Sequence, residues 1–230
     1  MTARQLTLDL PHRAALGRED FFVTGSNAAA VALVDQWPNW PSHGAMIVGP
    51  PGSGKSHLAS VWQQRSGAPI MPLRDLKRER VPGYFGEKAL AIEAGESFDG
   101  DETALFHALN HARQDGKSLL ITSPVQPTNW TIALPDLRSR LAALPVAVIA
   151  QPDDVLLRVV LVKQFADRQI AVNEAVISYL AARMPRALDF VRQLVDAIDR
   201  AALEQGAEVT RPFAARILEQ LSHPDMPGLT

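Results

Sequence analysis

Cysteine is absent from the 230-residue sequence. Its absence excludes disulfide bonds and thiolate metal sites, and it suits a reducing compartment such as the cytoplasm. A strong charge of one sign is also missing, because the formal net charge is only −2. The chain therefore has no overall basic field of the kind that marks many nucleic-acid-binding proteins, although a local basic patch stays compatible with this value.

The sequence has no long hydrophobic run. The apolar stretch 141–150 is ten residues long and contains Pro145, which is too short to cross a bilayer. The first residues lack the basic, apolar and small-residue parts of a secretory signal. We therefore predict neither a membrane span nor a signal peptide, and we expect a cytoplasmic protein without a membrane partner.

The composition is that of an ordinary globular protein, with 47% hydrophobic and 21% charged residues. A chain of 230 residues can bury a core and can form one large domain with a small second one. It shows no internal repeat and no low-complexity tract.

The segment 49–56 reads Gly-Pro-Pro-Gly-Ser-Gly-Lys-Ser and matches the phosphate-binding P-loop pattern at every fixed position. A buried strand is predicted before it at 45–48, and a helix after it, from His57 to Gln64. Glycines let successive backbone N–H groups converge on phosphate oxygens, where the helix N-terminus adds partial positive charge. This context predicts a nucleotide site.

Two side chains of this loop have specific roles in that prediction. Lys55 would reach the β- and γ-phosphates, and the Ser56 hydroxyl would bind Mg²⁺. The full set predicted to bind nucleotide from this segment is Gly49, Pro50, Gly52, Ser53, Gly54, Lys55, Ser56 and His57.

Further strands are predicted at 68–73, 88–93, 118–122 and 146–150. Glu93 ends the 88–93 strand, where a P-loop domain needs a carboxylate to orient the Mg²⁺ shell. The next position, which in such ATPases often carries a second acid, is Ala94. The sequence therefore predicts metal binding by Ser56 and Glu93 and a weakened capacity for hydrolysis.

Two other polar clusters have simpler interpretations. His107 and His111 have the i, i+4 spacing of metal ligands, but no third ligand is near in sequence, so a polar helix face is favoured over a zinc site. The mixed charges of 74–80 indicate a solvated face rather than a nucleic-acid patch. We expect any contact with DNA to be indirect or weak.

The pattern changes near residue 151 from alternating strands and helices to helices alone, predicted at 153–167, 173–182, 186–205 and 210–221. Asp153, Asn173 and Thr210 are the expected N-caps. The predicted organisation is an extended arm at 1–20, a nucleotide-binding α/β domain at 21–151 and a helical domain at 152–230.

The arm contains Gln5, Leu6, Leu8 and Leu10, which alternate amide and apolar groups at the period of an extended strand. Such a segment can dock in a groove of another protein. It can equally pack its leucines on its own domain, and periodicity does not separate the two.

The stretch 134–141 carries Arg138 and Arg140, which are two residues apart and cannot serve the same face of a helix. One can pair locally with Asp136 while the other projects. A projecting arginine can reach a phosphate bound by a neighbouring subunit, in the arrangement known as an arginine finger.

These segments together resemble the DnaA branch of the AAA+ ATPases, and within it the Hda-type regulatory inactivators. The resemblance covers nearly the whole chain and rests on the P-loop, the 134–140 stretch, Met184-Pro185-Arg186-Ala187-Leu188, the start at Phe22-Val23 and the opening Gln5-Leu6-Thr7-Leu8-Asp9-Leu10. It implies an AAA+ fold: an α/β domain with a parallel five-stranded sheet flanked by helices, followed by a small all-α lid domain.

The resemblance also implies roles for single residues. Arg140 would be the trans-acting arginine finger and Arg186 the lid arginine that touches the nucleotide. The opening hexapeptide would bind the DNA sliding clamp through Gln5, Leu6, Leu8 and Leu10, and ADP or ATP with Mg²⁺ would hold lid and core together. Initiators continue into a DNA-binding domain for which this sequence leaves no room, so we expect an inactivator.

The implied activity is negative regulation of replication initiation through ATP hydrolysis on DnaA, with self-association left open. Two alternatives remain from the sequence. One is a self-sufficient P-loop enzyme, such as a helicase-loading ATPase or a small-molecule kinase. The other is a nucleotide-binding scaffold without catalytic partnership. The pair Glu93-Ala94 does not decide whether the chain itself hydrolyses ATP. It fits an activator of ATP hydrolysis on a partner better than an enzyme.

Overall fold

The computed structural model of the chain describes residues 21–222. Its centre is a parallel five-stranded sheet, which confirms the predicted fold class. The strands are β1 (Gly44–Val48), β2 (Ile70–Pro72), β3 (Ala89–Glu93), β4 (Ser118–Ser123) and β5 (Val146–Val148). Their order across the sheet is β2-β3-β4-β1-β5, so the P-loop strand lies between two parallel neighbours.

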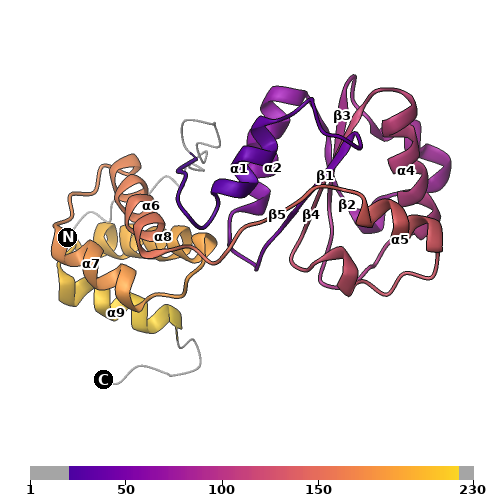
Figure 1. The fold of residues 1–230 in the computed structure, drawn as a ribbon. Helices are drawn as coiled ribbons and strands as arrows, with labels where there is room; N and C mark the ends of the chain where they lie inside the picture. Colours follow the sequence, from indigo (N-terminus) through magenta and orange to yellow (C-terminus); the bar gives the residue numbers. More distant parts are fainter. Residues whose placement is uncertain (1–20, 223–230) are drawn as a thin grey trace, which may run out of the picture.

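Both faces of the sheet are covered by helices. Because alternate residues of a strand point to opposite sides, one strand contributes to a core on each face. On β1, Met46 and Val48 join one buried cluster, while Ala45 and Ile47 join another. Figure 1 shows α1 and α2 on the side of the sheet toward the C-terminal helices, and α4 and α5 on the far side. The inner strands β1 and β4 are buried along their whole length, as parallel strands covered on both faces are, whereas Val146 and Val148 of the edge strand β5 are exposed.

The helices of this α/β part follow their sequence signals. They are α1 (Ala28–Asp35), α2 (Lys55–Ser66), the short α3 (Val81–Tyr84), α4 (Glu102–Gln114) and α5 (Pro135–Ala142). The apolar stripe of α4 is buried, from Ala104 to Ala112, and the Asp101 carboxylate caps the helix by accepting from two backbone amides. The charged stretch 74–80 forms 3₁₀ turns, which the sequence did not predict.

The C-terminal part consists of four helices within the described residues: α6 (Asp154–Asp167), α7 (Glu174–Arg183), α8 (Leu188–Gln205) and α9 (Arg211–Ser222). Their inward faces form a separate apolar core that includes Leu161, Phe165, Leu180, Leu194 and Ile198. Figure 1 shows this helical unit at one end of the molecule and α4 and α5 at the other. No helix of residues 21–222 has the length and apolar character that crossing a membrane requires.

The junction between the two parts is fixed by Asp153, the N-cap of α6. Its carboxylate accepts from the Leu156 amide at 2.7 Å. This hydrogen bond holds the pKa of Asp153 below its usual value, with smaller help from the Thr24 side chain and the Ser26 backbone and against the effect of burial. The Ala150 amide also donates to the Ser26 carbonyl. The segment entering α1 is thereby tied to the start of α6.

We expect Asp153→Ala to lower the free energy of unfolding by about 1 kcal/mol at pH 7, since an N-cap contributes roughly that amount. Because the folded-state pKa is depressed, this part of the stability is present above the ordinary value of 3.8 and is lost as the pH falls through the folded-state pKa. Urea unfolding at several pH values measures both effects. Asp153→Asn is the control: it keeps the cap at pH 7 and removes the acid dependence of this site, so equal loss in both variants would contradict the assignment.

Candidate nucleotide-binding site

The P-loop connects the carboxyl end of β1 to the N-terminus of α2, as the sequence predicts. Gly52 and Gly54 have φ values of 70° and 99°, which side chains other than glycine rarely adopt. The backbone also passes close to other groups at Gly49, where an added Cβ would lie 2.5 Å from the Ile149 carbonyl oxygen. All three glycines of the motif are therefore required by the path of the loop.

Lys55 is held over this loop. Its Nζ donates to the carbonyl oxygens of Gly49, at 2.7 Å, and Pro50, at 2.8 Å. Burial lowers the pKa of Lys55, and the charges of Glu93 and Asp189 act in the opposite direction. The ammonium group thus lies at the carboxyl edge of the sheet, near two carboxylates.

The loop also contains a polar atom suited to an anion. The Ser53 hydroxyl is buried and has no hydrogen-bond partner among residues 21–222. A buried hydroxyl without a partner is costly, and a phosphate oxygen in the loop is a natural acceptor for it. Together with the N-terminus of α2 and Lys55, this donor set fits the phosphates of a nucleotide.

The residues predicted to bind Mg²⁺ come from two elements at the same edge. Ser56 lies in the first turn of α2, and Glu93 ends β3 opposite Thr122 of β4. The Ala94 amide donates to the Thr122 carbonyl, which keeps the end of β3 in the sheet. Mg²⁺ commonly takes only one or two protein ligands beside water and phosphate, so Ser56 and Glu93 fit that ion. On α4, His111 Nδ1 is 2.9 Å from the Asp115 carboxylate, and the His111 ring packs edge-on against Phe85.

The helical unit lies directly on the P-loop. The Leu188 amide, at the start of α8, donates to the Gly52 carbonyl at 2.7 Å. A Cβ added to Gly52 would lie 2.6 Å from Ala187 Cβ and 2.3 Å from an Asp189 carboxylate oxygen. Sequence reasoning missed these three residues, because nothing in the pattern of an amphipathic helix indicates which loop its first turn will contact.

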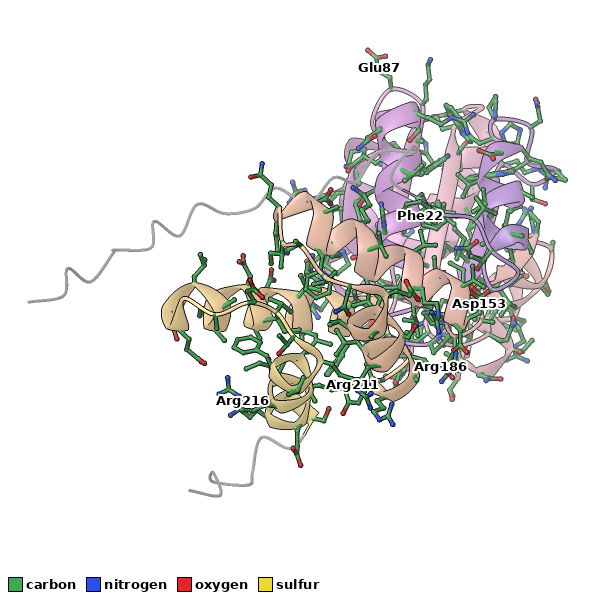
Figure 2. All side chains as sticks on the ribbon, turned by 90° about the vertical axis from the view of Figure 1, so that its left-hand side faces the viewer. Phe22, Glu87, Asp153, Arg186, Arg211 and Arg216 are labelled. Carbon is green, nitrogen blue, oxygen red and sulfur yellow. The ribbon has the colours of Figure 1, made fainter. Side chains whose placement is uncertain are left out.

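Arg186, the residue predicted from the sequence at this junction, bonds within the helical unit. Its guanidinium donates to the Pro152 carbonyl at 3.1 Å and to the Asp154 carboxylate at 2.7 Å. Figure 2 shows Arg186 beside Asp153, at the start of α6. The structure thus ties Arg186 to the N-terminus of α6, while Asp189, three residues on, lies near Lys55. Its contact with a nucleotide stays a prediction.

The two arginines of α5 differ in their surroundings. Arg138 donates to the Ile132 carbonyl at 2.7 Å, and not to Asp136 as the sequence suggested. Arg140 lines a cavity of about 200 Å³, which we call the α4–α5 cavity and which Ser42, Leu109, Arg113 and Leu144 also line. Arg138 is therefore exposed and bonded to its own loop, whereas Arg140 is half-buried in the wall of this cavity. The role of Arg140 as an arginine finger stays a prediction.

The start of α5 is fixed by α4. The Glu102 carboxylate, in the first turn of α4, accepts from the backbone amides of Ala133 and Leu134 at 2.8 and 2.6 Å. Bonds of backbone amides to a carboxylate are stronger than those between neutral groups. The position of Arg140 is thereby set by the packing of α5 on α4. The predicted clamp-binding residues Gln5, Leu6, Leu8 and Leu10 lie outside the described residues.

Comparison with known proteins agrees with this geometry. Residues 154–218 match the family model described as Hda, lid domain. Domain III of the replication initiation protein DnaA from Thermotoga maritima superposes with a TM-score of 0.70 at 20% identity, over 92% of this chain and 98% of that one. The chain has the AAA+ fold, and its helical unit matches the Hda lid domain over residues 154–218.

Two further similar proteins have a lower structural similarity or no described function. The chain also resembles the Holliday junction branch migration motor RuvB of T. maritima, with a TM-score of 0.65 and 15% identity over 85% of this chain and 67% of that one. An uncharacterised protein of Haemophilus influenzae is 25% identical over 184 residues, which are 75% of this chain and 80% of that protein. The structural similarities establish the fold, and the lid match connects the chain to Hda.

Proposed function

We propose that this chain is a nucleotide-bound negative regulator of chromosomal replication initiation. In this proposal it docks on the DNA sliding clamp and stimulates ATP hydrolysis by the initiator DnaA. The observation that carries it is the placement of Arg140. Its guanidinium has no bonding partner among residues 21–222 and lies near the amino ends of β1 and β5, away from the chain's own P-loop. An arginine so placed is out of reach of a nucleotide in the chain's own P-loop, which supports a role on a phosphate held by another molecule.

The chain's own P-loop would hold ADP or ATP. The loop backbone from Gly49 to Gly54 would surround the phosphates, Lys55 would neutralise their charge, and Ser56 and Glu93 would hold Mg²⁺. The lid contact at Gly52 supports a structural role for this nucleotide, because whatever binds the loop also meets the start of α8. A ligand shared by two units stabilises their docked arrangement.

We retain the division into an arm at 1–20, an AAA+ domain at 21–151 and a lid domain at 152–230. The arm would provide the clamp contact through Gln5, Leu6, Leu8 and Leu10, inserted as an extended peptide into an apolar groove. Docking on the clamp would tether the chain to DNA and so raise its effective concentration near DnaA. Arg186 would report the nucleotide to the lid once its bond to Asp154 is exchanged for one to phosphate.

The experiment follows phosphate release from DnaA loaded with labelled ATP, in the presence of the sliding clamp loaded on DNA. Adding this chain should accelerate release strongly, while the chain alone hydrolyses ATP far below the usual enzymatic rate of about 1 per second. Turnover near that rate by the isolated chain, with no effect on DnaA, would favour a self-sufficient P-loop ATPase instead.

The variant Gln5→Ala/Leu8→Ala tests the clamp contact in the same assay. It should lose co-elution with the clamp and lose the part of the acceleration that depends on clamp, while it keeps nucleotide binding. Val23→Ala, at an exposed residue that follows the arm, is the control and should behave as the unaltered chain. Co-elution that persists in the double variant would mean that the arm packs on its own domain.

A further inference from the structure

The α4–α5 cavity lies at the amino-terminal edge of the sheet. Ser42 precedes β1, Leu144 precedes β5, and Arg113 and Arg140 come from the last turns of α4 and α5. The P-loop begins at the other end of β1, and five residues of strand span about 16 Å. Figure 1 shows α4 and α5 at the opposite end of the molecule from the lid. A nucleotide in the chain's own P-loop cannot reach this cavity.

The cavity is positively charged and its charge is not neutralised. Neither Arg113 nor Arg140 forms a side-chain hydrogen bond or ion pair with any of residues 21–222, and no carboxylate lines the cavity. Two guanidinium groups that share one small cavity repel each other. The carboxyl ends of α4 and α5 offset part of that repulsion with their partial negative charge. The N–H donors of both groups still need acceptors.

The remaining lining limits what those acceptors can be. The Ser42 hydroxyl already donates to the Ala143 carbonyl at 3.2 Å, so it is not available to a ligand. The guanidinium groups of the two arginines therefore supply the donors of the cavity. Leu109 and Leu144, which are more than nine-tenths buried, form an apolar part of the wall, while Arg140 is half-buried and Arg113 is exposed at the rim. A volume of about 200 Å³ lies below the roughly 300–1,000 Å³ of sites that enclose a whole small molecule. The cavity suits the anionic end of a larger ligand.

We propose that the α4–α5 cavity receives the terminal phosphate of a nucleoside triphosphate held by a partner protein, and that Arg113 is a second guanidinium beside Arg140. Two planar guanidinium groups can bond several oxygens of one phosphoryl group, which a single arginine cannot do as completely. This inference rests on the proposed function and adds to it a residue and a receiving site.

The chemical step itself takes place on the partner. The oxygen of a water molecule bonds to the γ-phosphorus while the bond from that phosphorus to the β–γ bridging oxygen breaks, giving the diphosphate, inorganic phosphate and a proton. Arg113 and Arg140 take no part in the proton transfer. They neutralise the charge on the γ-phosphoryl oxygens in the transition state, which should appear in kcat more than in KM.

The first experiment compares Arg113→Ala, Arg113→Lys and Arg216→Ala in the DnaA phosphate-release assay. We expect Arg113→Ala to lower the maximal stimulated rate of ATP hydrolysis at least about 10-fold, with little change in the concentration of this chain that gives half of the maximal stimulation. Arg113→Lys should recover the rate only in part, because lysine lacks the planar fork of donors that arginine has. Arg216, on α9 of the lid, is a distant control whose replacement should change nothing. Full stimulation by Arg113→Ala, while Arg140→Ala is inactive, would overturn this inference and leave the proposed function in place.

The second experiment needs no partner and decides the inference even if DnaA is not the target. In a Lys55→Ala background, which disables the P-loop, binding of inorganic tripolyphosphate is measured by calorimetry. Adding Arg113→Ala should weaken that binding at least about 10-fold, whereas adding Arg216→Ala should leave it unchanged. Equal binding with and without Arg113 would overturn the proposal, and unaltered thermal unfolding of each variant would show that it is folded.

Discussion

Arg140→Ala is expected to reduce the stimulated rate of ATP hydrolysis on DnaA by about 10³-fold or more, the usual effect of removing an arginine finger. Nucleotide binding by the chain itself should be unaffected, because Arg140 lies at the other end of the sheet from the P-loop. Folding should also be unaffected, since the guanidinium has no partner among residues 21–222 whose loss would cost stability. Phosphate release in single turnover, with the clamp present, measures the loss.

Arg138→Ala is the matched control on the same helix. Its guanidinium bonds the Ile132 carbonyl, so its loss should lower the free energy of unfolding by about 1 kcal/mol and leave the stimulated rate nearly intact. The contrast separates a role in trans from a general effect on α5. Unchanged stimulation by Arg140→Ala, or equal loss in both variants, would refute the assignment of Arg140.

Lys55→Ala is expected to weaken binding of ADP and ATP by about 10²-fold or more. The ammonium group is the positive charge at the centre of the P-loop, and each charge-assisted bond to phosphate contributes about 1.5–3 kcal/mol. The substitution also removes the donor for the carbonyl oxygens of Gly49 and Pro50. Titration of a fluorescent ADP analogue measures the change in Kd.

Lys117→Ala is the control for that experiment. Lys117 lies just before β4, at the amino end of the sheet, and donates to the Gly86 carbonyl. Its loss should leave the Kd for nucleotide unchanged. Retained affinity in Lys55→Ala would show that the glycine-rich loop is a structural turn, and the proposal of a nucleotide that joins lid and core would fail with it.

The sequence predicted the α/β part well because its signals are local. The P-loop glycines, the buried strand before them and the helix after them each depend on residues within a few positions of one another. The same holds for the N-caps Asp153 and Asn173, whose side chains accept from the amides of Leu156 and Val176. The order of the strands was not predicted, since pairing depends on contacts between distant segments, and the resemblance implied only a parallel five-stranded sheet.

The parts that could not be predicted involve residues brought together by tertiary packing. The approach of Ala187 and Asp189 to Gly52 depends on how the lid docks, and no pattern within 186–205 indicates it. The shared cavity of Arg113 and Arg140 depends on the angle between α4 and α5. Arg138 and Asp136 are close in sequence, yet the Ile132 carbonyl is the acceptor, because the loop before α5 folds back over that arginine.

The hydrogen bonds from Ala133 and Leu134 to Glu102 have a consequence for encounter with a partner. They place α5 against α4 in the free chain, so the helix that carries Arg140 is already ordered before association. Binding then has to immobilise only the arginine side chain, not a loop, and the loss of conformational entropy on complex formation is correspondingly small. A receiving site preorganised in this way leaves more of the contact energy for affinity, because little of it is spent on ordering the chain.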